Sequence, residues 1–324
     1  MPVVKHSSYI APLFLRNGHF NTFFSSIMRK LESVPYVRER IVTPDNDFLD
    51  LDWSKVNGKK CVVLAHGLEG NSDSSYIRGM VQFFNSLGWD AVCWNLRGCS
   101  GEPNITSKLY HSGCVEDLDC VIKWVNSKFN YEAVSLVGFS LGGNVVLKYL
   151  GEMGKSLVSS VKGAVCFSVP CDLRSSAEKL ACPTNRLYMR SFLKSVRIKL
   201  EQKLKKFPGL LSFEGFEQVK NFFQFDEKFT APLHGYMNAE DYYLKCSSKQ
   251  FLSKIAIPTL LISAKDDPML GRGCFPVKEA EANDLFFLET PDHGGHAGFC
   301  NGSSHGVFWS ETRTAQFLDE HVGL

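Results

Sequence analysis

Residues 134–150, with the sequence VSLVGFSLGGNVVLKYL, contain the pattern from which the fold can be predicted. Residues 134–138 form a short apolar run typical of a buried strand, and residues 141–150 are helix-like in composition. Between them stands Ser140, flanked by small residues that permit a strained, sharp turn from strand to helix. Such a turn exposes the serine hydroxyl, although the same glycines also suit a plain turn with no chemical role.

Short apolar runs recur along the chain and alternate with segments of helix length. The predicted strands are residues 61–65, 91–95, 134–138, 161–169, 259–263 and 285–288, and the predicted helices are residues 74–87, 114–129, 141–152 and 308–321. This alternation predicts an α/β fold with a mostly parallel central sheet and helices on both faces. Residues 38–43 and 48–53 flank a turn cluster and predict an antiparallel hairpin at the edge of the sheet.

Residues 171–248 interrupt this alternation, because they contain no clean strand and are rich in phenylalanine. A stretch of about 75 residues is too long for a plain loop, so it must have a structure of its own. We therefore expect residues 1–170 and 249–324 to form a single catalytic α/β domain. Residues 171–248 are expected to be an inserted helical cap or lid over its site.

The composition is that of an ordinary globular protein and excludes several functional classes. The 324 residues are 44% hydrophobic and 22% charged, with a net charge of +2, so nucleic acid is disfavoured as a partner. The 11 cysteines are scattered and show no Cys-x-x-Cys spacing, which fits a reducing, cytoplasmic setting. No signal peptide and no apolar run of about 18 residues is found, so we expect a soluble protein.

The downstream sequence supplies the partners that a nucleophilic serine needs. A serine hydroxyl is activated when an imidazole accepts its proton and a carboxylate orients that imidazole. After Ser140, the predicted strand at residues 259–263 leads into residues 264–268, which carry two aspartates. The strand at residues 285–288 leads into a glycine-rich loop, residues 290–299, with two histidines. The chain order is therefore serine, acid, histidine. This is the order that accompanies a nucleophile elbow in an open α/β sheet.

Two choices within this set depend on local geometry. Asp267 is preferred to Asp266 as the orienting acid because it adjoins Pro268, which fixes the turn. His296 is preferred to His293 as the base because small residues flank it and let the loop reach over the serine. The His-x-x-His spacing also occurs in metal sites, but no matching ligands accompany it, so we expect no metal and no cofactor.

Acyl transfer also requires amide donors for the developing oxyanion. The N–H of Leu141, directly after Ser140, is the first candidate. The second is the N–H of Leu68, which follows a predicted strand and the pair His66-Gly67. His66 would then hold the loop, although a simple strand-ending turn explains the same residues.

Residues 186–206 form the most basic segment of the chain, with eight Lys or Arg and only Glu201 as an acid. Apolar residues are interleaved with these charges, so the segment has the pattern of a basic amphipathic helix that could dock on anionic lipid. A solvated helix in the cap, with its apolar residues turned to the core, is the more common origin of such a pattern.

With these pieces located, the chain resembles the α/β-hydrolase superfamily, and within it the YheT-like branch, AB hydrolase family four. The resemblance covers nearly the whole chain and rests on residues 17–22, 38–40, 66–70, 95–103, 110–113, 138–144, 230–235, 266–268 and 293–299. It implies a serine hydrolase of the carboxylesterase or acylglycerol lipase type, with Ser140 as nucleophile, His296 as base and Asp267 as acid. The implied substrate is a small or lipid-like acyl ester with a short to medium chain.

Three functional hypotheses follow from the sequence. The leading one is an esterase in which Ser140 forms an acyl-enzyme and the amides of Leu68 and Leu141 stabilise the oxyanion. In the second, the same triad cleaves an amide, thioester or carbon–carbon bond, since one fold hosts many chemistries. The third is a hydrolase-like binding module without turnover. The basic segment adds peripheral contact with a membrane as a further prediction.

Overall fold

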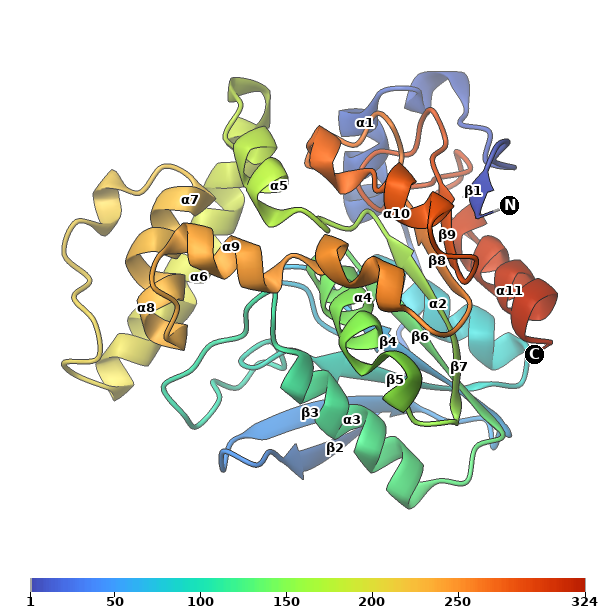
Figure 1. Ribbon diagram of the computed structural model, residues 1–324, viewed down its shortest axis with the longest axis horizontal. Helices are drawn as coiled ribbons and strands as arrows, with labels where there is room; N and C mark the ends of the chain where they lie inside the picture. The colour runs from blue at the N-terminus through green and yellow to red at the C-terminus, as the bar shows by residue number, and fades with distance from the viewer. Residues whose placement is uncertain (1, 324) are drawn as a thin grey trace.

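The computed structural model describes residues 2–323, and its centre is one nine-stranded sheet with the order β1-β9-β8-β7-β6-β4-β5-β3-β2 (Figure 1). β3 runs antiparallel to its neighbours β2 and β5, and the remaining neighbours pair in parallel. The strands are β1 (Val3–Val4), β2 (Val37–Val42), β3 (Phe48–Ser54), β4 (Lys60–Ala65), β5 (Asp90–Asn95), β6 (Ala133–Phe139), β7 (Val161–Phe167), β8 (Thr259–Ile262) and β9 (Phe286–Glu289).

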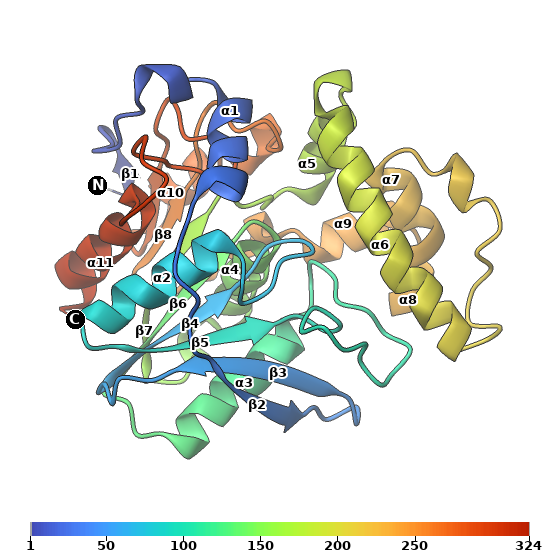
Figure 2. The same cartoon turned by 180° about the vertical axis from the view of Figure 1, so that it is seen from behind.

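Helices cover both faces of this sheet. Figure 1 shows α3 and α4 in front of it, and Figure 2 shows α2 and α11 in front of the opposite face. The helices are α1 (Gly18–Phe23), α2 (Ser75–Ser86), α3 (Val115–Lys128), α4 (Leu141–Met153), α5 (Leu173–Leu180), α6 (Arg186–Lys206), α7 (Phe222–Phe225), α8 (Ala231–His234), α9 (Ala239–Cys246), α10 (Val277–Glu281) and α11 (Trp309–Val322).

The period-two alternation of the strands divides the core into two clusters. In β4, Cys61 and Val63 pack in the cluster that α3 and α4 complete, whereas Val62 and Leu64 pack in the cluster of α2 and α11. Strands buried on both faces are apolar at almost every position, which is why they appear in the sequence as continuous apolar runs. The predicted α/β fold, its hairpin and its two helical layers are confirmed.

The predicted elements and the observed ones differ at their ends by one or two residues. β1, α1 and α10 were not predicted from the sequence. β1 has only two residues, and it joins the sheet beside β9, where Val3 pairs with Leu288. So short a strand leaves no periodic signal in the sequence.

Residues 171–248 leave the sheet after β7 and return before β8, its neighbour in the sheet. We call this segment the helical insertion; it contains α5 to α9 and lies beyond the carboxyl ends of the central strands (Figures 1 and 2). Phe216, Phe225 and Phe229 form its buried centre together with apolar residues of α6. The insertion therefore has a small core of its own.

The described part of the chain, residues 2–323, contains no helix with both the length and the apolar character needed to cross a bilayer.

The eleven cysteines, all within the described residues, are free thiols, and Cys182 alone among them is exposed to solvent. Burial raises the pKa of several of these thiols, as at Cys99, where it reaches about 11. Such a thiol is protonated at neutral pH and is a poor nucleophile.

Candidate active site

Ser140 lies at the sharp turn between β6 and α4 that the sequence predicts. Its backbone is in the left-handed region, with φ of 51°, which a residue with a side chain adopts only under strain. Two glycines allow this geometry. A Cβ on Gly142 would stand 2.4 Å from the carbonyl oxygen of His66, and one on Gly138 would stand 2.6 Å from Cα of Gly143. The elbow is therefore closed to larger residues at both positions.

The loop after β9 brings His296 to this serine. Nε2 of His296 lies 2.9 Å from Oγ of Ser140, and Nδ1 lies 2.9 Å and 3.1 Å from the two carboxylate oxygens of Asp267. A carboxylate only accepts hydrogen bonds, so the ring proton belongs on Nδ1. Nε2 is then the acceptor that faces the serine hydroxyl, which is the arrangement that general-base chemistry requires.

Asp266 and His293, the alternatives weighed in the sequence, form a separate pair. Oδ2 of Asp266 lies 3.3 Å from Nδ1 of His293, and Oδ1 accepts the N–H of Gly295. The side chain of Asp267 is fully buried, whereas that of Asp266 is 19% exposed. Adjacent aspartates thus serve different partners, and Asp266 holds the loop that carries His296.

Two further residues that the sequence analysis did not single out hold this loop. Oγ1 of Thr22, in α1, accepts the N–H of His296 at 2.8 Å, and Oγ of Ser168 accepts the N–H of Ala297 at 2.8 Å. Ala297 and Phe299 both have positive φ, so the loop is strained and depends on such anchors. The resemblance at residues 17–22 was the only signal in the sequence for Thr22.

Leu68 and Leu141 both line the cavity next to Ser140 and His296. Within residues 2–323, neither backbone N–H has a hydrogen-bond acceptor, so both remain available as donors. His66 holds the first of these loops: its Nε2 accepts the N–H of Leu96, and its Nδ1 donates to the carbonyl oxygen of Gly67. Burial lowers the pKa of His66 to about 4, so the ring is neutral and keeps this arrangement at ordinary pH.

Glu69, directly after Leu68, is the centre of a polar cluster. It has φ of 57°, and its N–H donates to the hydroxyl of Tyr110, which in turn donates to the Glu69 carboxylate. Nζ of Lys199, on α6, lies 3.0 Å from the same carboxylate and 2.9 Å from Sγ of Cys99. The helical insertion is thus bound by an ion pair to the loop that presents the Leu68 amide.

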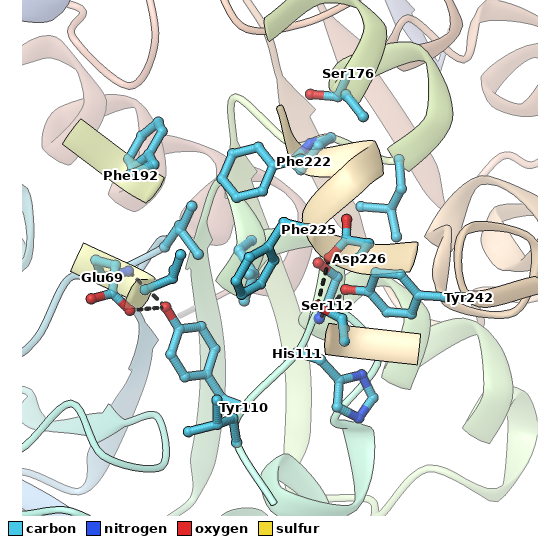
Figure 3. Close-up of a pocket in the computed structure, with 18 of the residues that line it drawn as sticks. Glu69, Tyr110, His111, Ser112, Ser176, Phe192, Phe222, Phe225, Asp226 and Tyr242 are labelled. Atoms are coloured by element: carbon cyan, nitrogen blue, oxygen red, sulfur yellow. Dashed lines mark hydrogen bonds between the residues drawn. The ribbon is translucent and has the colours of Figure 1, made fainter. Parts of the chain in front are cut away.

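The cavity extends from Ser140 into the helical insertion and has an empty volume of about 1100 Å³, its open mouth included. Figure 3 shows the rings of Phe222 and Phe225 near the middle of the view and the ring of Phe192 at the upper left, above Glu69. The Glu69 and Tyr110 pair lies to the left of Phe222 and Phe225 in this view, and a second polar group lies to their right. The second group contains Asp226, Tyr242, Ser112 and His111.

Asp226 is a buried carboxyl group in the wall of this cavity. It accepts hydrogen bonds from Oγ1 of Thr230 at 2.6 Å and from the hydroxyl of Tyr243 at 2.8 Å. Burial raises its pKa to about 7 despite these two donors. Burial also lowers the pKa of His234, which lines the same cavity, to about 4, so that ring adds no charge to the cavity wall.

The basic residues of α6 divide into two groups. Toward the end of the helix, Nζ of Lys203 donates to the carbonyl oxygens of Asn104 and Thr106, and Arg197 pairs with Glu201 and Glu217. These residues attach the helix to the protein and are not a free basic surface. The first turns are different, because Arg186, Arg190 and Lys194 are exposed.

Within residues 2–323 no cluster of three or more His, Cys, Asp or Glu has the arrangement of a metal site.

The chain is similar to known proteins in both sequence and structure. The model of a family described as alpha/beta hydrolase fold matches residues 60–301. YheT of Escherichia coli, a candidate esterase by its name, is 35% identical over 94% of this chain and 91% of its own length. Human phospholipase ABHD3 is 29% identical over 93% of this chain and 75% of its own. Monoacylglycerol lipase of Saccharomyces cerevisiae is 30% identical over 85% of this chain and 62% of its own.

Solved structures show the same fold at lower sequence identity. The Pyrococcus furiosus esterase Pf2001 superposes with a TM-score of 0.60 at 18% identity, over 91% of this chain and 96% of that one. The alpha/beta hydrolase GrgF of a Penicillium species gives a TM-score of 0.60 at 15% identity, over 90% of this chain and 100% of that one.

Proposed function

The chain belongs to the alpha/beta hydrolase fold family, in its YheT-like branch, and from this premise we propose that it is a serine hydrolase of acyl esters. Ser140 is the nucleophile, His296 the general base and Asp267 the orienting acid. The observation that carries the proposal is the continuous chain of contacts from Asp267 through His296 to Oγ of Ser140.

The reaction follows from the proton positions. Nε2 of His296 takes the proton of Ser140 while Oγ attacks the acyl carbonyl, and the imidazolium that forms is stabilised by the buried Asp267 carboxylate. His296 then gives the proton to the departing alcohol, which leaves an acyl-enzyme. A water molecule, deprotonated by the same imidazole, attacks this ester and releases the acid and free Ser140.

The amides of Leu68 and Leu141 are the proposed donors to the oxyanion of both tetrahedral intermediates. Each such donor contributes about 10²–10³ in rate in enzymes of this kind. The proposal is supported by the position of both residues at the cavity beside Ser140 and by the absence of an acceptor for either N–H within residues 2–323.

The helical insertion, residues 171–248, is the proposed cap, and it supplies most of the acyl pocket. Phe192, Phe222 and Phe225 offer apolar area, and the Asp226 group bounds this apolar part at one side (Figure 3). An acyl chain of short to medium length fits such a pocket, since a longer chain would have to bury methylene groups against the Asp226 carboxyl. Lipid-like esters are the proposed class because relatives of the chain are named as a phospholipase and a monoacylglycerol lipase.

The experiment is a kinetic comparison of the wild-type protein with Ser140→Ala on p-nitrophenyl esters of increasing acyl length. We expect the wild-type protein to hydrolyse short- to medium-chain esters fastest, and the variant to lose at least about 10⁴-fold in kcat. Matched thioesters and anilides are assayed in parallel. Faster hydrolysis of either would indicate that the enzyme cleaves a thioester or an amide bond. Full esterase activity in Ser140→Ala would overturn it.

A further inference from the structure

The first helix of the chain, α1, and the π-helical turn that continues it, Phe24–Met28, have their polar side facing inward. Asn21, Thr22 and Ser25 are buried. Nδ2 of Asn21 donates to the hydroxyl of Tyr9, and Oγ1 of Thr22 accepts the N–H of His296. The polar positions of this segment are therefore fixed by contacts inside the protein.

The apolar side of the same segment consequently faces solvent. Phe20 is 67% exposed, Phe23 is 49% exposed and Ile27 is 64% exposed. Their spacing of three and four residues puts them on one side of the helix. An ordinary surface helix turns this side to the core, so α1 is amphipathic in the reverse sense. The neighbouring exposed side chains enlarge the apolar surface: Ile10, Leu13, Phe14 and Met28.

The charged side chains closest to this apolar face in the sequence are mostly basic. The chain has no Asp or Glu before Glu32, while Arg16 and Lys30 are exposed close to the apolar residues in sequence. The first turns of α6 add Arg186 and Arg190. Within the described residues, none of these four cations forms an ion pair with a carboxylate, so they are free to meet an anionic surface.

The two segments meet at the candidate active site. The ring of His19, in α1, stacks on the ring of Tyr188, in α6, with centroids 5.7 Å apart. Figures 1 and 2 both show α1 and the first turns of α6 at the same end of the molecule. α1 also holds the His296 loop through Thr22, and α6 lines the cavity through Phe192.

We propose that the exposed face of α1 and its turn, together with the first two turns of α6, docks on a lipid bilayer that carries anionic headgroups. Aromatic and aliphatic side chains at a bilayer surface bury their area in the interface, and adjacent cations bind the headgroups. This combination fits a bilayer better than a second copy of the chain, whose matching face would bring the same positive charges together. The inference rests on the proposed function only in placing the esterase beside its lipid substrate.

The test uses co-sedimentation of the purified protein with vesicles of phosphatidylcholine, alone or with one-third phosphatidylserine. The wild-type protein is expected to bind the anionic vesicles and to lose binding as salt is raised. The triple variant Phe20→Ser, Phe23→Ser, Ile27→Ser should lower the partition coefficient at least about a hundredfold. The double variant Arg186→Gln, Arg190→Gln should lower it about fivefold per charge, on anionic vesicles only.

The matched control replaces three apolar residues elsewhere that are more exposed than Phe20, Phe23 and Ile27. Val37, Met237 and Leu244 are 70%, 83% and 69% exposed, and their triple serine variant should bind vesicles as the wild type does. Thermal melting checks that each variant is folded. Single variants at Phe20 and Ile27 replace the triple variant if it fails this check, and each should weaken binding about tenfold.

Several results would overturn the proposal. These are a wild-type protein that does not sediment with anionic vesicles, and a folded Phe20, Phe23, Ile27 variant that binds them as tightly as the wild type. A dimer that the same variant converts to monomer, without vesicle binding, would assign the face to a second copy. Hydrolysis of a water-soluble short ester should be the same in all these variants. If no protein hydrolyses that ester while vesicle binding behaves as expected, the proposed function fails and the docking surface stands.

Discussion

Several single residues around the candidate site have a strained backbone. Ser140, Glu69, Ala297 and Phe299 all have φ between 44° and 57°, a region that side-chain-bearing residues rarely adopt. Each such residue costs about 1–3 kcal/mol and persists only where its surroundings hold it. The two loops and the elbow that meet at the cavity therefore hold the side chains of the site in place, and their strain lowers the stability of the fold.

The two adjacent aspartates give a sharp prediction for catalysis. Asp267→Asn should lower kcat about 10²–10⁴-fold, because an amide facing Nδ1 of His296 stabilises neither the correct tautomer nor the imidazolium. Asp266→Asn, the matched control, should cost less than about tenfold, since its amide oxygen still accepts the N–H of Gly295. Steady-state kinetics on one ester measure both, and the reverse ranking would contradict the assignment.

Asp226 predicts a dependence of stability on pH. Burial raises its pKa from 3.8 to about 7, so between these values the folded chain holds a proton that the unfolded chain has released. Stability should therefore fall as the pH rises from about 4 to about 7, by a few kcal/mol at most. Asp226→Asn removes this titration, so its melting temperature relative to wild type should rise between pH 5 and pH 8. The prediction would be contradicted if the difference in melting temperature between the two proteins were the same at pH 5 and pH 8.

The residues of the proposed triad could be found in the sequence because each lies in a local pattern at the end of a predicted strand. Ser140 has its glycine-rich turn, Asp267 its proline, and His296 its small neighbours. The residues that hold them in place could not be found in this way. Thr22 contacts His296 from 274 positions away, and Lys199 reaches Glu69 from another element, so only the folded chain brings them together.

At the scale of elements, the central strands were predictable because burial on both faces makes them apolar throughout. α1 was not, because its apolar side faces solvent and its polar side faces the protein, which is the opposite of the pattern that identifies a surface helix. In the helical insertion, the sequence indicated helical character but not the separate helices, since short helices such as α7 and α8 have four residues each.

The link between α6 and the loop of Leu68 gives the prediction for this scale. Lys199→Met leaves Glu69 without its cation, and the strained loop loses a contact that fixes it. We expect kcat to fall about tenfold or more with little change in KM, and stability to fall by about 1–3 kcal/mol. Lys205→Met, on the same helix but exposed, is the control and should leave both unchanged. Equal behaviour of the two variants would contradict the proposed role of this contact.

For the whole molecule, the site is assembled from distant parts of one chain. The N-terminal segment supplies Thr22, and the turns after β6 and β8 supply Ser140 and Asp267. The helical insertion supplies Lys199 and Phe192. The insertion also begins and ends at β7 and β8, which pair with each other in the sheet. The length of the chain would allow two domains, but these shared contacts favour the predicted single domain with an insertion.

This arrangement predicts a single cooperative unfolding transition, because Lys199 and Lys203 tie the insertion to the loops that follow β4 and β5. Differential scanning calorimetry measures it. The ratio of calorimetric to van't Hoff enthalpy should be close to one. A separate transition at lower temperature, lost when residues 171–248 are cut by a protease, would show that the insertion unfolds independently.

If Ser140 is the activated nucleophile, a reagent that attacks such serines should label it covalently. The folded protein is treated with a fluorophosphonate, its intact mass is measured, and the modified peptide is sequenced by mass spectrometry. We expect one adduct, on Ser140, which forms rapidly in the wild-type protein and is lost in His296→Gln although Ser140 is still present. A folded wild-type protein that stays unlabelled, or one labelled at another residue, would contradict it.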